Sequence, residues 1–171
     1  EYSFSCYAVA QFAKQLNKTK DYGLLNKLAG SWENIFDKET HLMRPRLTDG
    51  SFIKDFDPTA PWIGFQEGNA IQYTFYVPHE PERLIEKVGQ NIFNNRLDSI
   101  FIISQSNIFG GGKELNAFSG LHALYNHGNQ PNLQTAWLFN FSGKTHLTQK
   151  WTRTICNEFY GTEGIHGYGY V

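Results

Sequence analysis

The spacing of apolar residues is the feature that most constrains how this chain folds. Apolar side chains recur every three or four residues in successive segments, which is the period of one face of an α-helix. The first two segments carry them at Cys6, Val9, Ala10, Ala13 and Leu16, and at Leu25, Leu28, Ala29, Trp32, Ile35 and Phe36. A short polar linker, residues 17–21, separates the two segments. We therefore predict an antiparallel helical hairpin at the start of the chain.

Later segments repeat the helical period, and none is rich in strand-forming residues. Pro81 and Pro131 stand where the first turn of a helix tolerates proline. The apolar faces comprise Leu84, Ile85 and Val88; Phe93, Leu97, Ile100 and Phe101; Leu133, Ala136 and Trp137; and Leu147, Trp151, Ile155 and Phe159. Two long irregular stretches, residues 37–66 and 104–130, interrupt the helices. Short linkers alternating with long loops predict an all-α fold, an α/α toroid with its long loops on one face, and a helical repeat array is the competing architecture.

Composition and charge exclude several classes of partner. The chain has 171 residues, 40% of them hydrophobic, which suffices for one sizeable core. A formal net charge of −1 without a Lys and Arg cluster gives no surface for nucleic acid or for an anionic membrane. No apolar run reaches the roughly 20 residues that span a bilayer. We therefore expect neither a nucleic-acid partner nor a membrane segment.

Cysteines and glycosylation patterns bear on the cellular compartment. Cys6 and Cys156 lie in predicted helices among apolar residues, so we interpret them as buried free thiols, with a disulfide as the alternative. Asn17-Lys18-Thr19 and Asn140-Phe141-Ser142 fit the N-glycosylation pattern, which suits a secreted protein. The chain starts at Glu1 rather than Met, and we expect it to begin inside a longer protein.

Glu67 is the candidate general acid. It follows the long loop 37–66 and precedes a helix that we expect to begin near Asn69. Loops held by a rigid scaffold are where catalytic groups concentrate. Aromatic residues nearby would form the apolar wall that a general acid needs to hold a proton near neutrality; these are Trp62, Phe65, Tyr73 and Tyr76. The alternative is an ordinary surface carboxylate.

A second polar group surrounds a glycine at residues 125–131. Amide oxygens of Asn129 and Gln130 suit a hard cation such as calcium, and the His127 ring suits a hydrogen bond to a sugar hydroxyl. A helix-capping loop with Asn129 as the cap explains the same residues. The residues alone leave both interpretations open.

These two groups, in this order, resemble glycoside hydrolase family 92, the calcium-dependent exo-acting α-mannosidases. The resemblance covers essentially the whole chain. Further family-like segments are Trp32–Asp37, Leu42–Arg46, Asp49–Phe52, Phe56–Pro58, Val77–His79 and Glu158–Thr162. The resemblance implies an inverting hydrolase with an (α/α)6 toroid packed against an N-terminal β-sandwich. Residues 1–171 would then be one partial domain, a piece of the toroid that lacks the sandwich and the toroid's C-terminal end.

The resemblance also implies roles for individual residues. Glu67 matches the general acid, while Gln72 and His127 match positions at the terminal mannose. Asn129 and Gln130 match positions at the calcium ion. The implied function is removal of terminal α-linked mannose from glycans with inversion, by a secreted or cell-surface protein.

Three departures from the family pattern limit this expectation. Ile71 replaces the usual Trp, Gln130 replaces a common Glu, and the family's general base, an Asp, has no counterpart in this chain. We therefore expect residues 1–171 alone to be inactive. A carbohydrate-binding or scaffold protein of the same fold without catalysis is the first competing hypothesis, and a helical repeat interaction module is the second.

Overall fold

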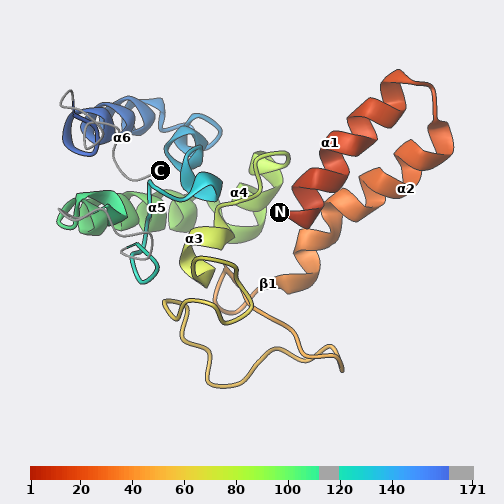
Figure 1. Ribbon diagram of the computed structural model, residues 1–171, viewed down its shortest axis with the longest axis horizontal. Coiled ribbons are helices and arrows are strands. Elements are labelled where there is room, and N and C mark those ends of the chain that lie inside the picture. The colour runs from red at the N-terminus through yellow and green to blue at the C-terminus, as the bar shows by residue number, and fades with distance from the viewer. Residues whose placement is uncertain (112–119, 162–171) are drawn as a thin grey trace.

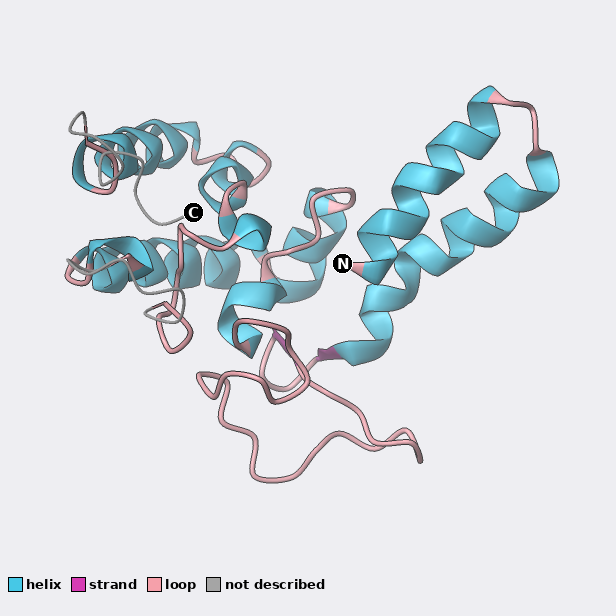
Figure 2. Ribbon diagram, in the orientation of Figure 1, coloured by secondary structure: helices cyan, strands magenta, loops and turns pink. Residues whose placement is uncertain are grey.

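Helices dominate the computed structural model, which describes residues 1–111 and 120–161 (Figures 1 and 2). The α-helices are α1 (Tyr2–Gln15), α2 (Thr19–Ala29), α3 (Ala70–Thr74), α4 (Pro81–Val88), α5 (Gln90–Gln105) and α6 (Thr145–Glu158). Short 3-10 helices are η1 (Gly30–Ile35), η2 (Ile108–Gly110), η3 (Gln130–Asn132) and η4 (Thr135–Asn140). Strands β1 (Phe36–Asp37) and β2 (Leu42–Met43) pair antiparallel, with Phe36 opposite Met43. The predicted all-α class is confirmed.

The first two helices form the predicted hairpin, which projects to one side of the molecule (Figure 1). Cys6, Ala10 and Ala13 are buried there, and these small side chains permit close packing against α2. The predicted apolar face is only partly correct, because Val9 and Leu16 are 51% and 53% exposed.

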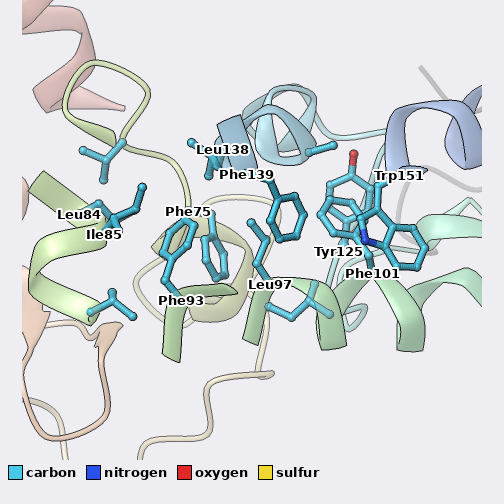
Figure 3. Packing of buried hydrophobic residues seen from close by; sticks show 14 of the residues in the cluster. Phe75, Leu84, Ile85, Phe93, Leu97, Phe101, Tyr125, Leu138, Phe139 and Trp151 are labelled. Carbon is cyan, nitrogen blue, oxygen red and sulfur yellow. The ribbon is translucent and has the colours of Figure 1, made fainter. Parts of the chain in front are cut away.

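The core lies on the other side, between α4, α5, η4 and α6 (Figure 3). Phe75 meets Phe93 at a ring-centroid distance of 5.5 Å, and Trp151 stacks on Phe101 at 5.3 Å. Aromatic side chains of this size bury a large apolar area, which is the main driving force for folding. The α6 period was predicted correctly, because Trp151, Ile155 and Phe159 are buried.

The helix expected after Pro131 is instead a pair of 3-10 turns, η3 and η4. Leu133 and Trp137, predicted to be buried, are 47% and 59% exposed, whereas Leu138 and Phe139 are buried. The coil of η4 is tighter than an α-helix: at three residues per turn, Ala136 and Phe139 lie directly above one another on the buried face, and residues four apart no longer share a face.

Arg44 and Arg46 hold the long loop in place. Arg44 pairs with Asp37 at 3.1 Å and donates from Nε to the Ile53 carbonyl at 3.1 Å. Arg46 donates to the Asn34 and Gly50 carbonyls and lies 3.8 Å from the centre of the Phe52 ring. Charge pairing and backbone hydrogen bonds therefore restrain the first part of this loop, as far as Ile53.

Both cysteines are free, Cys6 buried and Cys156 exposed. The expectation of two buried thiols is therefore wrong for Cys156, because its position on α6 faces away from the row Trp151–Ile155–Phe159. Gly112, Thr162 and the glycine-rich end of the chain lie outside the described residues. Within the described ranges, no helix combines the length and the apolar character that a bilayer crossing requires.

Candidate functional site

Glu67 lies where the long loop turns into α3. It is exposed, with a φ of 53°, which places its backbone in the left-handed region that residues other than glycine seldom occupy. Gly68 follows in a crowded position, because a Cβ there would lie 2.8 Å from Gln72 Oε1. The expected aromatic wall is incomplete: Phe65 is buried beside Tyr73, whereas Trp62 is 47% exposed.

Asn69 begins α3, as expected, and also ties it to a distant loop. Its Oδ1 accepts a hydrogen bond from the backbone N–H of Gln72 at 3.1 Å, which caps the helix. Its Nδ2 donates to the carbonyls of Leu121 and Ala123, both at 2.9 Å. Asn69 is fully buried, so these bonds satisfy polar atoms that water does not reach.

Gln72 makes a second link to the same loop. Its Nε2 donates to the carbonyls of Gly120 at 2.9 Å and Ala123 at 2.7 Å, and its Oε1 accepts from Asn132 at 3.4 Å. Both ends of the buried amide therefore have protein partners. The geometry gives Gln72 a bracing role, and direct contact with a sugar stays a prediction.

Asn129 joins the two predicted groups. Its Nδ2 donates to the Glu67 carbonyl at 2.7 Å, across a sequence separation of 62 residues. Asn129 also precedes η3, but its side chain makes no capping hydrogen bond there. The helix-cap interpretation is therefore wrong for this side chain, and the hydrogen bond brings Asn129 to the backbone of Glu67.

His127 is buried between two tyrosines. Nδ1 lies 2.6 Å from the Tyr125 hydroxyl, and Nε2 lies 2.8 Å from the Tyr160 hydroxyl. Burial lowers the pKa of His127 to about 4, so the ring is neutral near pH 7. A neutral imidazole has one donor and one acceptor nitrogen, so one tyrosine donates and the other accepts. A sugar hydroxyl would have to replace one of these partners, and substrate contact by His127 stays a prediction.

The amide oxygens of Asn129 and Gln130 fit a calcium ion only as part of a larger set. Because Asn129 Nδ2 is held by the Glu67 carbonyl, Oδ1 faces away from it, and no described residue donates to that oxygen. Gln130 is exposed at the next position. Calcium takes six to eight oxygen ligands, so these two neutral donors would need carboxylates, carbonyls, waters or substrate hydroxyls beside them. Among residues 1–111 and 120–161, no group of three or more His, Cys, Asp and Glu side chains is placed to hold a metal.

Several supporting contacts were not predicted. They are the hydrogen bonds from Asn69 to the loop at residues 121–123, those between His127 and its two tyrosines, and that from Asn132 to Gln72. The sequence signal was indirect, because Asn69 and Tyr160 lie within family-like segments but their partners are far away in the chain.

Residues 1–169 match the glycosyl hydrolase family 92 catalytic domain. The chain belongs to this family. The family GH92 α-mannosidase BT3965 from Bacteroides thetaiotaomicron is 34% identical to it, with a TM-score of 0.84. BT3965 in complex with mannoimidazole has a TM-score of 0.83 at 32% identity, and the family GH92 inverting mannosidase BT2199 from B. thetaiotaomicron VPI-5482 has 0.80 at 28%.

The family 92 chain matches only part of each of these proteins. Alignments cover 98% to 99% of this chain but 21% to 24% of the solved chains. Comparison with curated proteins finds no match. The similarity confirms the helical fold as part of a family 92 catalytic domain, and the activity of a complete protein is a separate question.

Proposed function

We propose that this chain contributes to a family 92 enzyme that hydrolyses terminal α-linked mannose from glycans with inversion. The observation that carries the proposal is the 2.7 Å hydrogen bond from Asn129 to the Glu67 carbonyl, which holds a candidate metal-binding residue against the backbone of the candidate acid. The similarity to solved α-mannosidases, one with bound mannoimidazole, supports mannose as the sugar.

Glu67 is the general acid in this proposal. Its carboxyl group protonates the glycosidic oxygen as the leaving sugar departs. An inverting enzyme also needs a general base about 6.5–9.5 Å from the acid to activate water on the opposite face of the sugar. We assign that base to residues beyond this chain, because no family-like Asp motif matches it here. The solved inverting mannosidase BT2199 supports this stereochemistry.

Asn129 and Gln130 would supply oxygen ligands to a calcium ion. When bound, the ion would orient mannose hydroxyls and stabilise negative charge near the reacting centre. Gln130 is neutral where the family commonly has Glu, so its contribution to the binding of a divalent cation is weaker than that of a carboxylate. Gln72 and His127 hold the surrounding loops, and they complete the mannose site in this proposal.

The proposed enzyme is longer than residues 1–171. The chain corresponds to about a fifth to a quarter of the solved family 92 chains. We therefore propose that residues 1–171 form one partial domain within an (α/α)6 toroid and are inactive alone. We also propose that the protein is secreted or displayed at the cell surface. Its proposed glycan substrates and its two N-glycosylation triplets support that location.

Substitution Glu67→Gln in the full-length protein tests the catalytic assignment. It should lower kcat/KM for mannose disaccharides by about 10²–10⁴-fold, because a sugar leaving group needs protonation. Aryl mannosides with very good leaving groups should lose far less. The matched control is Glu86→Gln on the exposed side of α4, which should change neither rate. Unchanged disaccharide hydrolysis by Glu67→Gln would refute the role of Glu67.

The competing hypothesis is a carbohydrate-binding protein of the same fold without catalysis. The neutral Gln130 favours it, because a weaker cation site weakens substrate orientation. The test is mannose binding by the full-length protein, measured by calorimetry beside hydrolysis. Binding without turnover would support this hypothesis, and turnover would exclude it.

A further inference from the structure

The backbone around Glu67 is held at three successive carbonyl groups. The Tyr73 hydroxyl donates to the Gln66 carbonyl at 2.6 Å, Asn129 Nδ2 to the Glu67 carbonyl at 2.7 Å, and the Trp62 amide to the Gly68 carbonyl at 3.2 Å. The three donors come from α3, from the loop before η3, and from the long loop. Such a set of restraints fixes both peptide planes that flank Glu67.

These hydrogen bonds restrain a backbone conformation that is unfavourable for a glutamate by itself. Glu67 has a φ of 53°, and an unrestrained glutamate strongly prefers negative φ. Residues persist in this region only where the surroundings over-determine them, and such residues concentrate at functional sites. The exposed carboxylate of Glu67 therefore projects from a peptide whose direction is set by its neighbours.

The hydrogen bond from Tyr73 is the restraint that can be removed by deleting a single oxygen atom. Its ring packs against Phe65 at 5.5 Å and Tyr76 at 6.5 Å, so the ring has support that does not depend on the hydroxyl. The Gln66 carbonyl oxygen, at 2.6 Å, is the nearer acceptor for the Tyr73 hydroxyl, and Glu1 Oε1 lies at 3.4 Å. Burial, followed by nearby carboxylates that include Glu67, raises the pKa of Tyr73, so its hydroxyl stays a donor.

We propose that Tyr73 is a positioning residue for Glu67: by holding the Gln66 carbonyl, its hydroxyl keeps the left-handed backbone from which the carboxyl group meets the leaving oxygen. This inference rests on the proposed function, in which Glu67 is the general acid. It assigns to Tyr73 no contact with substrate. It predicts a defect confined to reactions that need the acid.

Tyr73→Phe in the full-length protein removes the hydroxyl and keeps the ring. We expect kcat for a mannose disaccharide to fall about 5- to 10-fold, the loss of one well-formed hydrogen bond, with little change in KM. Hydrolysis of an aryl mannoside with a very good leaving group should stay within about twofold, because that reaction needs little proton donation. The matched control is Tyr22→Phe on α2, whose half-buried ring lies beside Lys14 and outside the Glu67 site, and it should leave both rates unchanged.

A double-mutant cycle separates positioning from a general structural effect. In the Glu67→Gln background, Tyr73→Phe should cost less than about twofold, because the group that it positions is gone. Equal losses on both substrates, a full loss in the Glu67→Gln background, or unfolding of Tyr73→Phe beside a folded Tyr22→Phe would each overturn the role of Tyr73. No selective loss in Glu67→Gln itself would instead overturn the proposed function.

Discussion

At the scale of single residues, Asp37 shows how the long loop before Glu67 is anchored. Its side chain in β1 is 4% exposed, and the ion pair with Arg44 spans 3.1 Å. Burial disfavours the charge, but the Glu39 amide and the Arg44 guanidinium outweigh it and lower the pKa of Asp37 below its ordinary value of 3.8. A carboxylate whose pKa is lowered on folding stabilises the folded state above its unfolded-state pKa.

Asp37→Asn tests this anchor. At pH 7 the substitution should lower the free energy of unfolding by about 2 kcal/mol, because the charged hydrogen bonds to Arg44 and Glu39 are weakened. The wild-type advantage should be complete above about pH 4 and should shrink as pH falls through the lower pKa of the folded state. Urea unfolding between pH 2.5 and pH 7 measures it.

The control for Asp37 is Asp21→Asn on the exposed first turn of α2. It should change the free energy of unfolding much less, because exposed substitutions rarely matter. A wild-type advantage over Asp37→Asn that stays constant from pH 7 to pH 2.5 would contradict the charge-based explanation.

At the scale of elements, Trp151 is the largest side chain that packs α6 against the core. It is 1% exposed and stacks on Phe101 of α5 (Figure 3). Its Nε1 donates to Asp98 at 2.7 Å. Helices of this length are marginal in water by themselves, so α6 depends on this packing.

Trp151→Ala should therefore lower the free energy of unfolding by about 3–5 kcal/mol through loss of buried area and the cavity it leaves. Trp137→Ala is the matched control, since Trp137 on η4 is 59% exposed and its loss should cost about 0.5 kcal/mol or less. Chemical unfolding followed by far-ultraviolet circular dichroism compares them. Similar losses in both variants would mean that burial does not distinguish these two tryptophans.

Helices could be predicted where the apolar residues of a segment repeat with the helical period. The 3.6-residue period identified α1, α2, α5 and α6, and it is clearest in α5 and α6, which each bury a row of apolar residues in the core. It misassigned residues 130–140, because a 3-10 turn is selected by the fit of Leu138 and Phe139 into the core, and local spacing does not carry that information.

At the scale of the whole molecule, the proposed calcium ion needs more ligands than Asn129 and Gln130 supply. Two neutral amide oxygens from Asn129 and Gln130 leave most of a coordination shell to other groups. We predict that a chelator removes mannoside hydrolysis by the full-length protein and that added calcium restores it. By calorimetry, residues 1–171 alone should bind calcium at least 100-fold more weakly than the full-length protein. Hydrolysis that survives chelation, or equal affinity in the two proteins, would contradict this assignment.

Sequence alone determined the helical class, the family resemblance, and the pairing of Glu67 with the Asn129 segment as the residues of interest. Only the tertiary structure decided how they meet: Asn129 reaches the Glu67 carbonyl, Tyr73 reaches the Gln66 carbonyl, and both amide ends of Gln72 are occupied within the protein. The physical reason is that periodicity records only which face of an element is apolar. The left-handed backbone at Glu67 is held by side-chain and backbone donors whose placement depends on packing, one of them, Asn129, from 62 residues away.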